Sequence, residues 1–107
     1  MRHVILTTAT GDTDTELIAA PAAGKAIAIY GFYFSSDGAQ RIDIEHGTTL
    51  LHRQYVPANG GSIAAFNGKD GVGASVLWQA PANTAVTYTN TVAANTVIEA
   101  WYDAVTA

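Results

Sequence analysis

The sequence predicts an all-β protein: a single-domain, antiparallel β-sandwich of jelly-roll type with about eight strands. Three observations lead to this prediction. Short runs rich in Val, Ile, Thr and aromatic residues recur along the chain, and such runs favour strands. Gly, Asn, Asp and Pro separate these runs at regular intervals, as in sandwiches. The length of 107 residues is that of one domain, so residues 1–107 are expected to form one sandwich.

The strands are expected where these runs lie between turn residues. The longest is Lys25–Ser36. Asp37 and Gly38 follow it as the centre of a predicted hairpin, because both residue types tolerate the positive φ of a tight turn. Gln40–His46 is expected to pair back against it, and the Gly-rich stretch 68–73 is expected to be a loop. The other predicted strands are Arg2–Thr8, 15–20, 48–56, 62–67, 75–79, 85–90 and 96–105.

Lys25–Ser36 is unusual because both of its faces are apolar under strict alternation. A sandwich hides only the inner face of each sheet, so a loop, a terminal arm or another subunit must cover the second face. That second face carries Tyr30, Phe32 and Phe34. These three residues are therefore predicted to lie at a subunit interface, and the protein is expected to self-associate.

The last predicted strand places Trp101 on its outward face, between Glu99 and Asp103. Two interpretations stay open. Trp101 is an interface residue if a neighbouring subunit covers it, since aromatic side chains dominate interface burial. Alternatively, Trp101, Glu99 and Asp103 form a ligand face on which a sugar ring stacks. A ligand face requires an exposed aromatic ring beside polar groups in a concave patch.

Composition argues against several classes of partner. The net charge is −4 and only 13% of residues are charged, so neither a nucleic-acid-binding patch nor a polybasic membrane anchor is expected. The apolar run near the N-terminus has three residues, too few for a signal peptide or a membrane span. The chain has no Cys, which fits folding in a reducing cytoplasm. The low charge suggests that neighbours cover much of the surface.

No catalytic site, metal site or cofactor is expected. The three histidines lack the i, i+2 spacing that a strand uses to bind a metal. Asp12, Asp14 and Glu16 alternate like the start of a calcium loop, but the required Gly and Glu further along are missing. They are predicted to be solvated turn carboxylates. No Ser lies in a Gly-x-Ser-x-Gly motif, so the protein is not expected to be an enzyme.

A pattern of turns and strands over residues 20–66 resembles a known class of proteins. It is carried by a Gly-Lys entry into a long strand at Gly24-Lys25, and then by Asp37-Gly38-Ala39, Ile42-Asp43-Ile44, Gly47-Thr48-Thr49-Leu50-Leu51 and Ala58-Asn59-Gly60-Gly61. This pattern resembles small virion structural proteins of tailed phages, of the capsid decoration (cement) or compact fibre-head type. The resemblance implies a jelly-roll-like fold, many copies per particle, self-association as a trimer rather than a dimer, and no catalysis.

The expected function is therefore that of a non-enzymatic virion structural protein, a capsid decoration protein that self-associates and stabilises the shell. Its expected partners are other copies of itself and the major capsid protein or another virion protein. Its expected location is the phage particle, after folding in the host cytoplasm. Residues 2–6 are a candidate arm for pairing with a neighbour's sheet edge. The alternative is a carbohydrate- or receptor-binding module of a phage fibre or tail tip.

Overall fold

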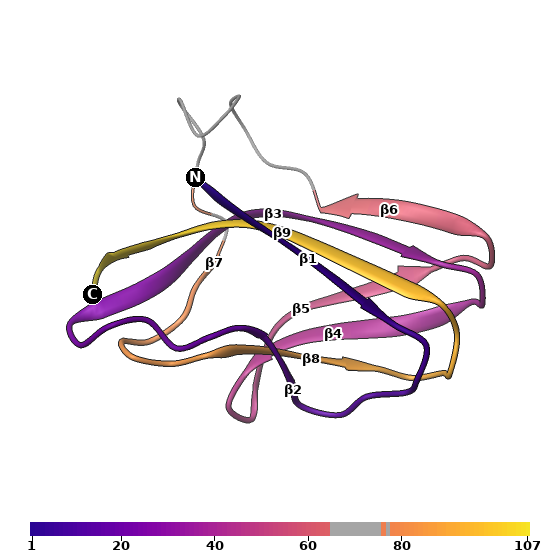
Figure 1. Ribbon diagram of the computed structural model, residues 1–107, viewed down its shortest axis with the longest axis horizontal. Helices are drawn as coiled ribbons and strands as arrows, with labels where there is room; N and C mark the ends of the chain where they lie inside the picture. The colour runs from indigo at the N-terminus through magenta and orange to yellow at the C-terminus, as the bar shows by residue number, and fades with distance from the viewer. Residues whose placement is uncertain (65–75, 77) are drawn as a thin grey trace.

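A computed structural model shows two antiparallel sheets that pack face to face as a β-sandwich (Figure 1). It describes residues 1–64, 76 and 78–107. The predicted loop 68–73, and parts of the predicted strands 62–67 and 75–79, lie outside these residues. Within the described range, no helix is long and apolar enough to cross a membrane.

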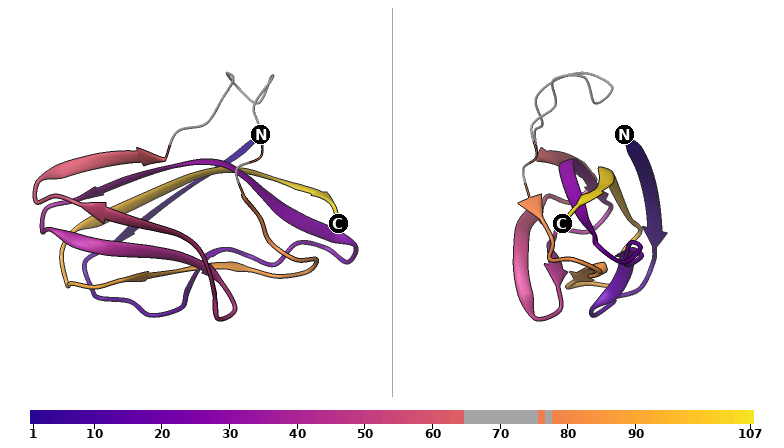
Figure 2. Two further views of the ribbon diagram at one scale, coloured as in Figure 1. Left: turned by 180° about the vertical axis from the view of Figure 1, so that it is seen from behind. Right: turned by 90° about the vertical axis from the view of Figure 1, so that its left-hand side faces the viewer.

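The strand order is that of a jelly roll. In the first sheet β6 and β7 pair with different parts of the same side of β3, so they act as one interrupted edge strand. The first sheet has the order β1 (Arg2–Thr8), β9 (Thr96–Thr106), β3 (Lys25–Ser36), and then β6 (Gly60–Ala64) with β7 (Trp78–Gln79). The second has the order β2 (Thr15–Ile18), β8 (Val86–Asn90), β4 (Gln40–His46), β5 (Thr49–Val56). Figure 2 shows the two layers from behind and from one end.

The predicted fold class is confirmed, and β1, β3 and β4 have the predicted bounds. The predicted hairpin at Asp37 and Gly38 is wrong. β4 pairs with β5 and β8 in the second sheet rather than with β3, and neither Asp37 nor Gly38 has a positive φ. The chain crosses between the sheets at this point, which local turn chemistry does not distinguish from a hairpin.

A β-bulge explains the two apolar faces of β3. The register of its pairing with β9 shifts between Ile29 and Gly31, so Tyr30 is an extra residue in the ladder. One extra residue reverses the alternation of side chains beyond it. Ile29 before the bulge and Phe32 and Phe34 after it therefore all point inward, and each is 0% exposed.

The prediction that Tyr30, Phe32 and Phe34 share an outward face is consequently wrong. Phe32 and Phe34 belong to the core cluster between the sheets, so they offer no surface to a second subunit. Tyr30 is half-buried at the bulge. The arm suggested for residues 2–6 also has a partner within the chain, because β1 pairs with β9 over its whole length.

The core lies between the inner faces of the two sheets. The predicted inward residues of β4, Ile42 and Ile44, are both 0% exposed. They pack in one cluster with residues from most of the other strands, among them Leu17, Ile27, Val56, Val86, Tyr88, Ile98 and Ala100. Burial of this apolar surface, worth roughly 25 cal/mol per Å², holds the two layers together.

Candidate functional site

The outer face of β1 and β9 carries the predicted residue Trp101 in a defined setting. His3 lies opposite Trp101 in the ladder, and the two rings stack with centroids 4.5 Å apart and planes 14° apart. His3 Nε2 also lies 2.8 Å from Glu99 Oε1, on the same face. Ile5, which lies opposite Glu99, is 60% exposed. Trp101 is half-buried and points outward, as predicted.

Asp103 lies further along β9, where its carboxylate is 3.6 Å from the amino group of Met1. Both carboxylates predicted beside Trp101 are thus already engaged, Glu99 by His3 of β1 and Asp103 by the N-terminal amino group. Three hollows of the described surface are lined by other residues: one around Ile27, one around Thr7 and one around Tyr55. The outer face around Trp101 is therefore part of a sheet surface and not the wall of any of these hollows.

Asp12 is not a solvated turn carboxylate, which corrects the prediction. It accepts hydrogen bonds from the hydroxyl groups of Thr8, at 2.8 Å, and of Thr10 and Tyr88. The bonds from Thr10, Tyr88 and Thr8, in that order of size, lower the pKa of Asp12. Burial, together with the bond to Asp12, raises the pKa of Tyr88 to about 12. Asp12 therefore joins the loop after β1 to the second sheet.

The outer face of the second sheet is a network of paired charges. Arg53 donates two hydrogen bonds to Asp43, at 2.8 and 3.1 Å, and Arg41 Nε lies 3.4 Å from the same carboxylate. The bond to Asp43 raises the pKa of Arg53. Glu45 accepts a bond of 2.7 Å from Thr89, while burial raises the pKa of Glu45. Each of these charged groups has a hydrogen-bond or ion-pair partner on the same face.

His52 is a packing residue at the rim of the core. Its ring stacks on Phe32 with centroids 5.9 Å apart and lies 4.9 Å from the ring of Trp78. Its Nε2 is 3.0 Å from Gln54 Oε1. Among the residues that the structure describes, no three His, Asp or Glu side chains gather as metal ligands would.

Comparisons of the chain with protein-family models, with curated proteins and with solved structures gave no match. The function is therefore inferred from the residues and surfaces of the chain itself. The face of His3, Ile5 and Trp101 combines an exposed aliphatic side chain with an ordered aromatic pair.

Proposed function

We propose that this chain is a non-enzymatic structural protein of a tailed-phage particle, a capsid decoration protein that binds the shell and stabilises it. The observation that carries this proposal is the outer face of the first sheet. There Ile5 is 60% exposed beside the stacked rings of His3 and Trp101. Proteins bury surfaces of this kind against a partner, and aromatic side chains supply much of the binding free energy at such interfaces.

The geometry of this face suits contact with a protein. The ring of His3 is held on one side by Trp101 and on its edge by Glu99. Side chains that are already ordered lose less conformational entropy on binding. Burial of Ile5 and of the two rings then contributes roughly 25 cal/mol per Å² of apolar surface. Many copies on one particle multiply this gain.

Self-association is part of the proposal. Phe32 and Phe34 do not support it, because both are in the core, and the evidence for it comes from β5 instead. β5 is an edge strand of the second sheet with Leu50 45% and Tyr55 68% exposed, and such an edge is a template for association. The resemblance to phage proteins favours a closed trimer, although a dimer would satisfy the physics equally well. Light scattering at micromolar concentration tests this part separately: a strict monomer contradicts self-association and leaves shell binding open.

Mass spectrometry of purified particles tests the proposed location. We expect this chain in many copies beside the major capsid protein. Binding of the purified protein to shells that lack it then tests the face. Ile5→Asp should abolish binding, whereas Val92→Asp, which also places a charge at an exposed apolar position (40% exposed), should not. Absence of the chain from particles, or equal binding by both variants, would contradict the proposal.

The alternative is a carbohydrate- or receptor-binding module of a fibre or tail tip. The presence of Trp101 and Glu99 on one outer face favours it, since sugars stack on indole rings and bond to carboxylates. Against it, Glu99 and Asp103 are engaged by His3 and the N-terminal amino group. Tryptophan fluorescence during titration with host-surface oligosaccharides distinguishes the carbohydrate-binding module from the decoration protein. A saturable change that Trp101→Phe removes and Trp78→Phe retains would replace the decoration proposal with this one.

A further inference from the structure

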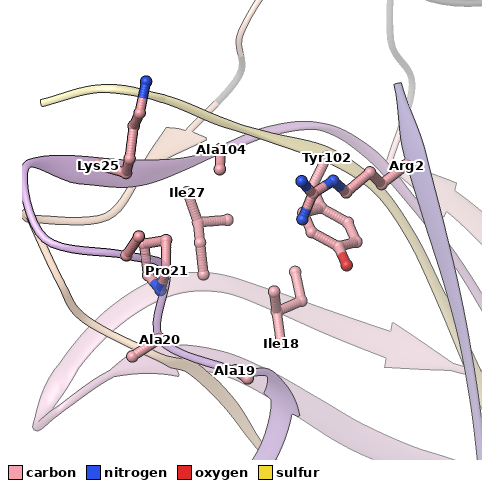
Figure 3. Close-up of a pocket in the computed structure, with 10 residues that line it drawn as sticks. Arg2, Ile18, Ala19, Ala20, Pro21, Lys25, Ile27, Tyr102 and Ala104 are labelled. Atoms are coloured by element: carbon pink, nitrogen blue, oxygen red, sulfur yellow. The ribbon is translucent and has the colours of Figure 1, made fainter.

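A cavity of about 580 Å³ opens at the end of the sandwich where β2 ends and β3 begins (Figure 3). Its base is formed by Ile18 and Ile27, which are 4% and 1% exposed. The loop of residues 19–22 forms one wall, and Tyr102 and Ala104 of β9 form another. A volume of this size is typical of sites for small organic ligands.

The charge of this cavity is opposite to that of the protein. The chain carries a net charge of −4, yet the lining holds Arg2 and Lys25 and no carboxylate. The structure describes four Lys and Arg side chains, and the other two, Arg41 and Arg53, pair with Asp43. In the described part of the chain, Arg2 and Lys25 form no ion pair. Among the described residues, the two cationic side chains that lack a carboxylate partner, Arg2 and Lys25, thus both line this cavity.

The side chains at the mouth differ in readiness to bind an anion. The guanidinium group of Arg2 lies beside the ring of Tyr102 in Figure 3. A guanidinium fork matches the two oxygens of a carboxylate. The ammonium group of Lys25 points away from the cavity in the same view, but its flexible stem lets it turn toward a bound anion.

We propose that this cavity binds a carboxylate carried on a short aliphatic body. Arg2 holds the carboxylate, with Lys25 adding a second positive charge, and the aliphatic part contacts Pro21 and Ala104. The lining favours this ligand over a sugar acid. Apart from Arg2, Lys25 and Tyr102, all of its side chains are aliphatic, so they offer no partners to the hydroxyl groups of a sugar. The ligand is either a free aliphatic acid or a glutamate side chain of a partner protein. This inference is independent of the proposed function.

Titration of the ¹⁵N-labelled protein with butanoate, followed by NMR, tests the site. We expect saturable shifts at the amides of residues 19–25 and 102–104, with a dissociation constant on the order of millimolar, as is usual for so small a ligand. Butanamide has nearly the same shape without the charge and should bind at least tenfold more weakly. Equal binding of the amide, or shifts centred elsewhere, would overturn the proposal.

Arg2→Gln is the decisive variant, and it should weaken butanoate binding at least tenfold. Arg41→Gln is the matched control, because it changes the net charge equally on the outer face of the second sheet, away from the cavity. Arg2→Lys should give an intermediate affinity, since it keeps the charge and loses the fork. Unchanged amide spectra outside the cavity show that each variant is folded. If Arg2→Gln and Arg41→Gln bind butanoate equally, the site does not exist as proposed.

Two further titrations distinguish the sources of the carboxylate. A capped tripeptide, alanyl-glutamyl-alanine, that binds more tightly than butanoate supports a glutamate side chain of a partner protein. Tighter binding of butanoate supports a free aliphatic acid. Tighter binding of glucuronate than of both contradicts the aliphatic part of the proposal.

Discussion

The two ends of the sandwich are built differently. The end at the right of Figure 1, where β1, β3 and β8 finish, is closed by buried polar side chains. Asn90 and Gln40, 3% and 7% exposed, lie at this end. Gln40 donates to Ser36, at 2.8 Å, and to Thr96, at 2.6 Å. Side chains there join the loops of both sheets.

The opposite end is held mainly by backbone contacts and contains the cavity. Asn83 donates its backbone N–H to the carbonyl of Lys25, at 2.9 Å, and Ala107 donates to Gly24, at 3.0 Å. The pair of His3 and Trp101 lies between the two ends, because Trp101 is opposite Gly31, midway along β3 and β9. Polar side chains thus fasten one end, while Arg2 and Lys25, which form no ion pair among the described residues, lie at the other.

The largest effect is expected at the closed end, from Asn90→Ala. The side chain of Asn90 accepts from the backbone N–H of Asp12, at 2.8 Å, and donates to the carbonyls of Thr10 and Val92, at 2.9 and 3.1 Å. Its loss leaves part-buried backbone groups without partners, so the free energy of unfolding should fall by about 2–4 kcal/mol.

Chemical denaturation measures this change. Thr84→Ala is the control at the open end, where the hydroxyl makes one exposed bond to the carbonyl of Ala82, and it should cost less than about 0.5 kcal/mol. If Asn90→Ala and Thr84→Ala lower the free energy of unfolding by similar amounts, side-chain hydrogen bonds do not stabilise one end of the sandwich more than the other.

Tyr88→Phe should have a smaller effect that depends on pH. The variant loses one hydrogen bond to the carboxylate of Asp12, worth about 1–2 kcal/mol near neutral pH. The lowered pKa of Asp12 gives stability that is present above its unfolded value of about 3.8 and is lost as the pH falls through the folded value. The raised pKa of Tyr88 gives stability that is present below pH 10 and is lost as the pH rises through about 12.

The difference in stability between the native chain and Tyr88→Phe should therefore be widest between about pH 4 and pH 10 and should narrow on both sides. Denaturant midpoints measured across this range test the prediction. A difference that is constant from pH 3 to pH 11 would show that Asp12 and Tyr88 are not linked.

The smallest effect on stability is expected at the open end. Arg2 and Lys25 are both exposed and form no ion pair in the described structure. Arg2→Gln and Lys25→Gln should each change the free energy of unfolding by less than about 0.5 kcal/mol, even though Arg2→Gln weakens the proposed carboxylate binding. A loss above about 2 kcal/mol in thermal or chemical unfolding would assign these residues a structural role instead.

The sequence predicts most of the strands, because alternation and turn residues are local signals. The prediction of which face a side chain occupies fails where one extra residue reverses the alternation. The bulge at Tyr30 moves Phe32 and Phe34 from the outer face to the core. Gly31 was the available signal, since an isolated Gly within a strand often marks a bulge. The turn at Asp37 is local too, but which sheet receives the next strand depends on the whole fold.

The candidate sites were predicted only in part. Trp101 and Glu99 were found on one face, since both lie on the same strand. The partner that orders them, His3, comes from the opposite end of the chain, 96 residues from Glu99. Asp12 and Tyr88 are 76 residues apart, and the cavity is lined by four separate segments. A pattern over a few neighbouring residues of the sequence does not indicate contacts between segments so far apart in the chain.

Hydroxyl-radical footprinting of purified phage particles tests most directly whether the outer face of β1 and β9 is buried against the shell. Trp101, on the outer face of β1 and β9 that is proposed to bind the shell, is compared with Val92, which is 40% exposed at the closed end. Relative to the free protein, Trp101 should lose most of its reactivity in the particle, and Val92 should keep its own. Unchanged reactivity at Trp101, or protection confined to Val92, would contradict the proposal that this face binds the shell.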